Sequence, residues 1–244
     1  MPDDQPDQAD SAQRLKAVRA RIADAAHQSG RSLSDITLLA VSKTFPIAAV
    51  DAVAAAGQHA FGENYAQEGV EKAIARPDLE WHFIGPLQSN KTRGVAEHFA
   101  WVHSVDRIKI AQRLSAQRPE TMTPLQVCIQ VNISNEDSKS GCAPEDALSL
   151  CQGIAGLPRI RVRGLMAIPE ATADPSNQRR HFAALRELLI DINAADHTLR
   201  LDTLSMGMSD DLEAAIAEGA TIVRVGSAIF GRRQYTHTPD SSEL

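Results

Sequence analysis

Short apolar runs alternate with longer amphipathic segments along most of the chain, and this rhythm restricts the fold more than any other feature. Residues 36–41 (ITLLAV) form an almost continuous apolar run, which is typical of a strand buried on both faces. Residues 125–133 (LQVCIQVNI) form the clearest strand of the second half. Segments with helical spacing follow these runs, and alternating strands and helices predict a parallel sheet.

One helix precedes the first strand. Its apolar residues Leu15, Val18, Ile22 and Ala25 share one face, and Gly30 ends it. The predicted strands cover residues 36–41, 60–64, 80–85, 101–105, 125–133, 162–168, 203–206 and 221–225. The predicted helical segments cover residues 46–56, 65–76, 88–99, 107–117, 144–155, 178–192, 209–219 and 228–230, with Ser209 as the N-cap of the seventh.

Eight strand–helix units in 244 residues match the size of a (β/α)₈ barrel. We therefore expect an α/β fold: a single TIM barrel over residues 11–235 with an extra N-terminal helix. Residues 1–10 are predicted to be a disordered tail, and residues 236–244 a flexible C-terminal tail. An open doubly wound sheet is the alternative, but it would more often carry a glycine-rich turn after the first strand, where this chain has SKTFP.

Composition limits the classes of partner and compartment. The formal net charge of −6 argues against a nucleic-acid-binding protein. Three cysteines without a CxxC pair argue against a disulfide framework and favour a reducing compartment. The N-terminus lacks the features of a signal peptide, and the apolar stretches are shorter than the ~20 residues of a membrane helix. We expect a cytoplasmic monomer that binds neither nucleic acid nor membrane.

Lys43 is the first candidate for chemistry, because it directly follows the first predicted strand. Active sites of such barrels lie at the C-terminal ends of the strands. Apolar surroundings lower the pKa of an amine and make it a better nucleophile toward an aldehyde. A surface lysine in a loop is the alternative interpretation.

A phosphate site is predicted after the last two strands. Ser205 follows the seventh strand, and Gly226 and Ser227 follow the eighth and open a short helical turn. Glycine permits close approach, serine offers a hydroxyl group, and the start of a helix offers N–H groups, so both loops together favour phosphate over mere tight turns.

Two further residues have open interpretations. Arg224 lies inside the last predicted strand, so it faces the lumen, the strand ends or the helix layer, and it either pairs with a carboxylate or donates to a ligand. Asn64 lines the mouth of the barrel or caps the next helix. Histidine and cysteine spacings typical of zinc are absent from the sequence, so no metal is expected.

A lysine at the mouth, a phosphate site and an arginine in the last strand together indicate pyridoxal 5′-phosphate (PLP). The motifs LLAVSK, FGENY, WHFIGPLQSNK, LSMGMSDD and VRVGSAIFG resemble those of the pyridoxal phosphate homeostasis protein family, from the first helix to about Arg232. Members are similar to the barrel domain of alanine racemase without its second domain. The resemblance implies that Lys43 carries the cofactor as a covalent aldimine. It also implies that Ser205, Gly226 and Ser227 hold the phosphate, that Arg224 faces the pyridine nitrogen, and that Asn64 lines the wall.

The resemblance further implies a protein that buffers and delivers PLP in vitamin B6 homeostasis, with PLP-dependent apoenzymes as recipients and without established catalysis. A PLP-dependent amino-acid racemase or a related enzyme is the alternative. A third possibility is a barrel enzyme whose lysine forms a Schiff base with a sugar aldehyde, which would be colourless as purified.

Overall fold

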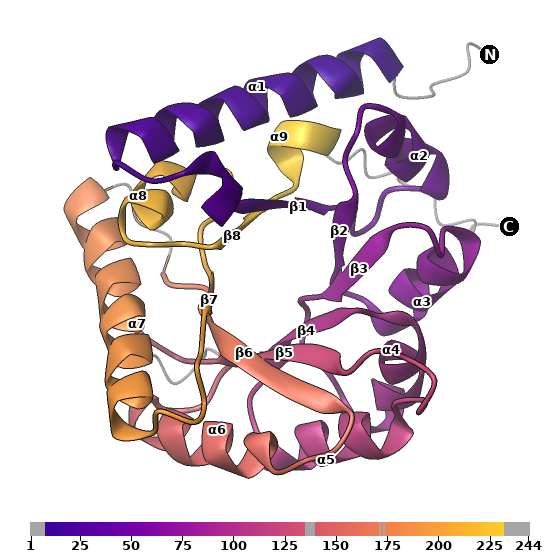
Figure 1. Cartoon of the computed structure of the whole chain (residues 1–244). Helices are drawn as coiled ribbons and strands as arrows, with labels where there is room; N and C mark the ends of the chain where they lie inside the picture. The colour runs from indigo at the N-terminus through magenta and orange to yellow at the C-terminus, as the bar shows by residue number, and fades with distance from the viewer. Residues whose placement is uncertain (1–7, 135–139, 171, 173, 232–244) are drawn as a thin grey trace, which may run out of the picture.

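The strands pair in parallel and in sequence order, and the last strand returns to pair with the first. The structure is a computed structural model that describes residues 8–134, 140–170, 172 and 174–231. The closed barrel confirms the predicted (β/α)₈ architecture (Figure 1). The predicted tails fall largely outside the described residues, although the first helix begins at Gln8, inside the predicted N-terminal tail.

The eight strands are short. Their bounds are β1 (Thr37–Val41), β2 (Ala60–Glu63), β3 (Glu80–Phe83), β4 (Trp101–Val105), β5 (Leu125–Gln130), β6 (Ile160–Met166), β7 (Thr203–Ser205) and β8 (Ile222–Val225). The α-helices are α1 (Gln8–Gln28), α2 (Ile47–Ala55), α3 (Ala66–Ala75), α4 (Thr92–His98), α5 (Ile108–Gln117), α6 (Ala147–Ala155), α7 (Pro175–Ala195), α8 (Leu212–Ala217) and α9 (Ser227–Phe230). Three 3₁₀ turns are η1 (Leu33–Asp35), η2 (Ser89–Lys91) and η3 (Pro144–Asp146).

Helix α1 lies across the outside of the barrel and contacts α2, α8 and α9 (Figure 1). Its predicted apolar face is buried: Leu15, Val18, Ile22 and Ala25 are 1–4% exposed. Arg14 on the same helix donates from Nε to the carbonyl oxygen of Ile229 at 2.8 Å, which ties α9 to α1. Helix α1 therefore holds α9, the helix that follows the last strand, against the outside of the barrel.

Side chains of the strands alternate between the lumen and the helix layer. In β8, Val223 and Val225 join the large core between strands and helices, whereas Ile222 joins a small separate apolar cluster that includes Leu39. Arg224 therefore shares the lumenal side with Ile222, because side chains two residues apart share a face. Of the three orientations that the sequence left open for Arg224, the structure has the lumen.

The predicted boundaries differ from the structure mainly at loops. The helix expected from Ser209 begins at Leu212, and its N-cap is Asp211 rather than Ser209. The carboxylate of Asp211 accepts from the N–H of Met208 at 2.5 Å, which closes a turn before the helix begins. Strand β5 ends at Gln130, three residues before the predicted end. Among the described residues, no helix combines the length and the apolar character needed to cross a bilayer.

Candidate functional site

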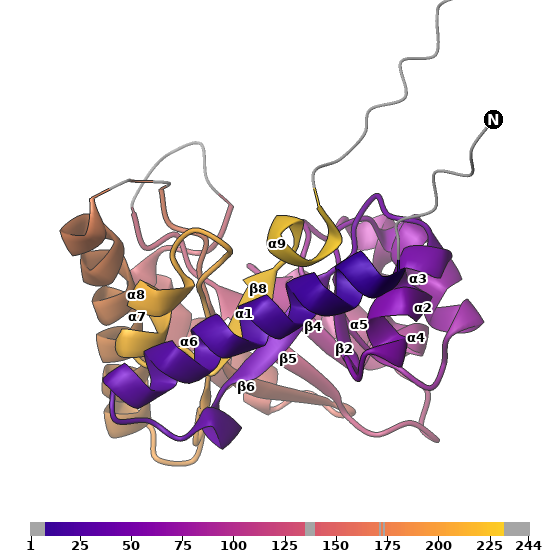
Figure 2. The same ribbon diagram turned by 90° about the horizontal axis from the view of Figure 1, so that it is seen from above.

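The C-terminal ends of the strands bring the predicted residues to one end of the barrel. Val41 of β1 pairs with Gly62 of β2, so Lys43 and Asn64 each follow a paired position by two residues. Ala40 pairs with Val225 of β8, directly before Gly226 and Ser227. Figure 2 shows α9 at the end of the barrel where β8 finishes. Sequence reasoning thus identified residues of three neighbouring strand ends.

The segment that carries Lys43 is held from outside the barrel by α3. Lys72 on this helix is buried, with 7% of its side chain exposed, and its Nζ donates to the carbonyl oxygen of Ser42 at 2.8 Å. The same Nζ donates to Oε1 of Glu63 at 2.7 Å, and the hydroxyl group of Ser42 donates to this oxygen at 2.6 Å. The backbone before the half-buried Lys43 is therefore tied to a buried ion pair.

The backbone after Lys43 is tied to the same ammonium group. Thr44 has a φ of 67°, an uncommon conformation for a residue other than glycine. Its N–H donates to Oε1 of Glu68 at 2.6 Å, and this oxygen also accepts from Nζ of Lys72 at 2.7 Å. Hydrogen bonds on both sides of Lys43 thus compensate for the strained conformation. We call Ser42, Thr44, Glu63, Glu68 and Lys72 the lysine-loop clamp.

Charge in the lysine-loop clamp is only partly balanced. Burial raises the pKa of the Glu63 carboxyl group, and the nearby Lys72 ammonium opposes that rise. Oε2 of Glu63 is buried and has no hydrogen-bond partner among the described residues. Removing Lys72 would leave a fully buried carboxylate without its cation, and such losses are strongly destabilising.

Helix α9 packs against the segment that follows Lys43. The rings of Phe45 and Phe230 stack with centroids 5.1 Å apart. A Cβ atom on Gly226 would lie 3.2 Å from the carbonyl oxygen of Val41, so the turn before α9 closely approaches the end of β1. The start of α9 and the lysine-bearing loop are therefore packed as neighbours.

Arg224 is a buried cation in the lumen, with 4% of the residue exposed. Its Nη1 donates to the carbonyl oxygen of Ser205 at 2.6 Å and to the hydroxyl oxygen of Ser205 at 2.9 Å. Its Nη2 donates to the carbonyl oxygen of Ala167 at 2.9 Å. Burial lowers the pKa of Arg224 to about 10. No ion pair among the described residues includes Arg224, so the carboxylate partner that the sequence left open is not found among them.

Ser205 does not have the environment that the sequence predicted for a phosphate ligand. Its side chain is fully buried, and its hydroxyl group contacts His103 Nδ1 at 2.7 Å as well as Arg224. The hydroxyl oxygen is thus engaged on the lumenal side, next to the guanidinium group. Gly226 is half-buried and Ser227 is exposed, so these two remain at the rim.

Asn64 lies in a tightly packed part of the rim. A Cβ atom on Gly85 would lie 2.0 Å from the carbonyl oxygen of Asn64, so only glycine fits beside it. The hydroxyl group of Ser104 donates to the carbonyl oxygen of Gly85 at 2.5 Å, which fixes this contact from β4. Oδ1 of Asn64 is buried and has no hydrogen-bond partner among the described residues, which is uncommon for a buried polar atom.

Sequence reasoning missed the lysine-loop clamp and His103. Glu68 and Lys72 are four residues apart on one helix, but nothing in the sequence indicates that they reach Ser42. His103 gave no usable signal either, because β4 has a register shift between Val102 and Val105 and both valines join the large core, so a strict two-residue period does not hold along it. His82, in the WHFIG segment, is buried as well, with hydrogen bonds at both ring nitrogens.

Comparison with known proteins identifies the family of the chain. Residues 13–234 match the family described as "Alanine racemase, N-terminal domain". The pyridoxal phosphate homeostasis protein of Pseudomonas aeruginosa is 61% identical over 226 residues, which cover 92% of this chain and 96% of that protein. The protein of the same name from Escherichia coli K12 is 52% identical over 233 residues, which cover 93% of this chain and 98% of that protein.

A solved structure with its ligand is similar as well. The structure of PipY from Synechococcus elongatus with PLP bound has a TM-score of 0.79 and 37% sequence identity, and covers 91% of this chain and 100% of PipY. The family match over residues 13–234 includes all eight strands, most of the leading helix and the strand ends that carry the candidate residues. The chain therefore belongs to the pyridoxal phosphate homeostasis protein family, whose members share the barrel of the alanine racemase N-terminal domain.

Proposed function

We propose that this chain binds PLP at the C-terminal end of its barrel and takes part in PLP homeostasis by buffering the cofactor and delivering it to PLP-dependent apoenzymes. The observation that carries the proposal is the juxtaposition of Lys43, the start of α9 and the buried guanidinium group of Arg224 on neighbouring strands. Relatives that match almost the whole chain are named homeostasis proteins rather than enzymes.

The residues present fit such a cofactor. Oδ1 of Asn64 is a buried acceptor without a partner among the described residues, and Arg224 is a buried cation whose ion-pair partner is missing from them. An aromatic cofactor with a ring nitrogen and a hydroxyl group supplies a donor for the Asn64 oxygen and an acceptor near the guanidinium group. A purely apolar ligand would leave the Asn64 oxygen unsatisfied, at a cost of about 1–3 kcal/mol.

Lys43 is the residue that would hold the aldehyde. Its amine would hold the aldehyde through a carbon–nitrogen double bond, with release of one water molecule. Such a bond would be reversible by hydrolysis, which suits a carrier. The lysine-loop clamp fixes the backbone on both sides of Lys43, which reduces the conformational freedom that the bond must restrict.

The phosphate fits the start of α9. The N–H groups of Ser227 and Ala228 are the first two of this helix, and such groups have no acceptor within their own helix. Ser227 adds a hydroxyl group, and Gly226 permits close approach. We assign the phosphate to these residues, and we assign Ser205 to the support of Arg224, because its hydroxyl group is engaged in the lumen.

Borohydride reduction tests the proposal. The protein incubated with PLP should show visible absorption that borohydride abolishes, and peptide mapping should then find the pyridoxyl group on Lys43. Lys109, which is exposed on α5, offers a matched control: Lys109→Ala should keep the absorption, whereas Lys43→Ala should lose it. A colourless protein, or a label on another lysine with Lys43 unmodified, would contradict the assignment.

Racemase activity is the alternative that the family relationship raises, because the matching family takes its description from alanine racemase. The PLP-loaded protein, incubated with a panel of L-amino acids, should form no D-isomer above the rate of free PLP. If a D-isomer forms and its formation depends on Lys43, the protein is a racemase and the proposed carrier function is wrong.

A further inference from the structure

A row of hydrogen-bonded polar side chains crosses the lumen from Arg224 to the opposite end of the barrel. Ser205 Oγ lies 2.9 Å from Arg224 Nη1 and 2.7 Å from His103 Nδ1. His103 Nε2 lies 2.9 Å from His82 Nδ1, and His82 Nε2 lies 2.8 Å from Oε1 of Glu80. We call Arg224, Ser205, His103, His82 and Glu80 the lumenal column.

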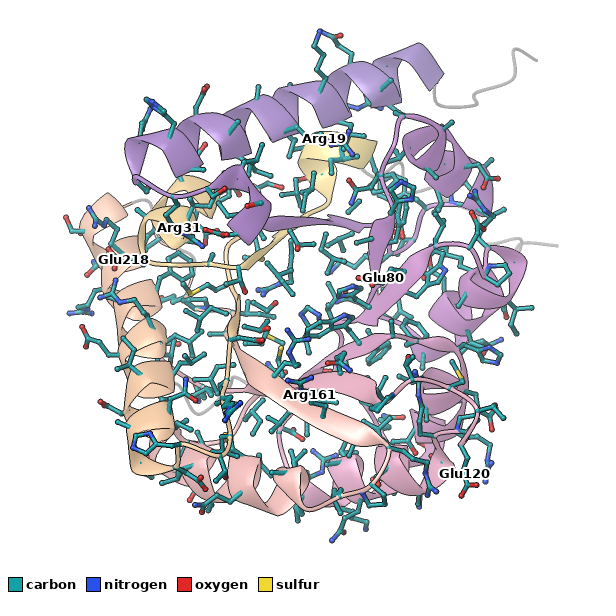
Figure 3. The ribbon with its side chains drawn as sticks, in the orientation of Figure 1. Arg19, Arg31, Glu80, Glu120, Arg161 and Glu218 are labelled. Carbon is teal, nitrogen blue, oxygen red and sulfur yellow. The ribbon has the colours of Figure 1, made fainter. Side chains whose placement is uncertain are left out.

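The lumenal column joins a buried end to an exposed one. Ser205, His103 and His82 are at most 1% exposed, whereas the side chain of Glu80 is 51% exposed. Glu80 is the first residue of β3, so it lies at the end of the barrel away from Lys43. Figure 3 labels Glu80 and shows it on the inner side of the ring of strands. The proposed cofactor site and the far mouth of the barrel are thus connected through five side chains.

The ends of the column determine the direction of each hydrogen bond. The Glu80 carboxylate only accepts, so an uncharged His82 must carry its proton on Nε2 and must accept at Nδ1. His103 then donates from Nε2 and accepts at Nδ1 from the hydroxyl group of Ser205. Arg224 only donates, so the hydroxyl oxygen of Ser205 accepts from Arg224. The hydroxyl proton of Ser205 then points to His103. Every donor in the column therefore points from Arg224 toward Glu80.

Burial supports uncharged imidazoles. It lowers the pKa of His82, and it lowers the pKa of His103 well below 6.5, with the His82 and Arg224 charges acting in the same direction on His103. The hydrogen bond from His82 lowers the pKa of Glu80, so that carboxyl group is ionised.

Other charged groups near the column have partners of their own. Arg163 lies over the Trp101 ring, 5.1 Å from its centroid, and pairs with Asp202 at 2.8 Å. The Trp101 ring stacks on the ring of His82, with centroids 5.5 Å apart. Asp211, the N-cap of α8, and Cys128, on β5, also act on the charge of Arg224, but among the described residues neither has a hydrogen bond to the column. The column is thus a separate, one-directional network.

We propose that His103 and His82, both in the Nε2–H form, are positioning residues that act through Ser205 to hold Arg224 in place, and that Glu80 anchors this arrangement from the opposite mouth of the barrel. The role toward the cofactor rests on the proposed function, in which Arg224 faces the pyridine nitrogen of PLP. The column fixes the Nη1 edge of the guanidinium group, so the group presents a constant orientation to the site.

The first test needs no cofactor. Long-range ¹H–¹⁵N spectra of the histidine-labelled, PLP-free protein should show Nε2 protonated and Nδ1 unprotonated for both His82 and His103 at neutral pH. Single replacements of each histidine assign the signals. An Nδ1–H form of His103, or a doubly protonated His82, would overturn the proposal, because either one reverses the direction of the column.

The second test uses the loaded protein and two carboxylates at the same mouth. Glu80 and Asp202 have side chains that are 51% and 50% exposed, but only Glu80 belongs to the column. Glu80→Ala should shift the pH midpoint of the PLP absorption change by roughly 0.5 unit or more, which corresponds to a threefold change in proton affinity. Asp202→Asn should leave the midpoint within about 0.2 unit of wild type.

Further variants separate hydrogen bonding from folding. Ser205→Thr keeps the hydroxyl group and should keep the wild-type midpoint, whereas Ser205→Ala should shift it in the same direction as Glu80→Ala. Equal midpoints in wild type and Glu80→Ala, with PLP bound and the fold intact, would overturn the proposal. Failure of wild type to take up PLP would instead contradict the proposed function, while the tautomers in the PLP-free protein would still decide whether the column exists.

Discussion

The Nζ atom of Lys72 lies 2.8 Å from the carbonyl oxygen of Ser42, the residue directly before Lys43. Lys72 is on α3, outside the barrel, yet it holds the backbone that carries the candidate PLP lysine. Its three hydrogen bonds, to Ser42, Glu63 and Glu68, use all the donors of an ammonium group. The lysine-loop clamp is therefore part of the site although it does not line it.

Lys72→Met should destabilise the protein and weaken the bond to PLP. The variant leaves Glu63 buried without its cation, and the expected loss in the free energy of unfolding is about 3–5 kcal/mol. Urea unfolding checks this value, and visible absorption reports the covalent bond. In the double variant Lys72→Met/Glu63→Gln, which removes both charges, much of the stability should return. If the single variant were as stable as wild type, the clamp would have no energetic role.

Lys43→Ala should abolish the visible absorption and still leave weak PLP binding. The phosphate contacts at α9 do not depend on the covalent bond. We therefore expect the dissociation constant for PLP to rise roughly 100-fold, and we do not expect binding to be abolished. Equilibrium dialysis measures the residual binding. Ser227→Ala in the Lys43→Ala background should weaken it further, and complete loss of binding in Lys43→Ala alone would argue against the phosphate assignment.

Arg224→Glu should change the electronic properties of bound PLP more than its retention. A carboxylate at this position favours a protonated pyridine nitrogen, whereas a guanidinium group disfavours protonation. The replacement also removes the donor to Ser205 and Ala167, so a loss of about 1–3 kcal/mol in stability is expected and must be measured first. A spectrum with the same pH response as wild type, in a folded variant, would show that Arg224 does not face the nitrogen.

Acid should destabilise the protein through His103. Burial lowers the pKa of this histidine in the folded state well below its usual value of 6.5, so the unfolded chain binds the proton first. This contribution is present above about pH 6.5 and is lost as the pH falls toward the folded pKa. Urea unfolding across this range should give a pH slope that is smaller in His103→Gln by up to about 1.4 kcal/mol per unit. Equal slopes in wild type and in His103→Gln would refute the prediction.

Gly85→Ala should disrupt the rim beside Asn64. The added Cβ would lie 2.0 Å from the carbonyl oxygen of Asn64, a backbone atom that has little room to move. We expect a destabilisation of about 3 kcal/mol or more, at the upper end for overpacking, together with weaker PLP binding. Gly156→Ala is the matched control, since nothing lies within 4 Å of its Cβ position, and it should stay within about 0.5 kcal/mol of wild type. Thermal unfolding compares the two variants directly.

The sequence by itself was sufficient to predict the barrel fold and to predict which residues lie at its C-terminal rim. Strand β1 and helix α1 follow from local patterns, because apolar runs and three- to four-residue spacing depend only on which faces must be buried. Once eight such units are recognised, closure into a barrel brings Lys43, Asn64, Gly226 and Ser227 to one end, since parallel strands all finish there.

Only the tertiary structure decided what these residues touch. Ser205 was expected at the phosphate, but β4 and β8 present His103 and Arg224 to its hydroxyl group across the lumen. Similarly, the approach of Lys72 to Ser42 depends on how α3 packs on β2 and β3. Side-chain partners far apart in sequence are selected by packing and by the need to satisfy buried polar groups, and the hydrophobic pattern of one chain contains neither of these.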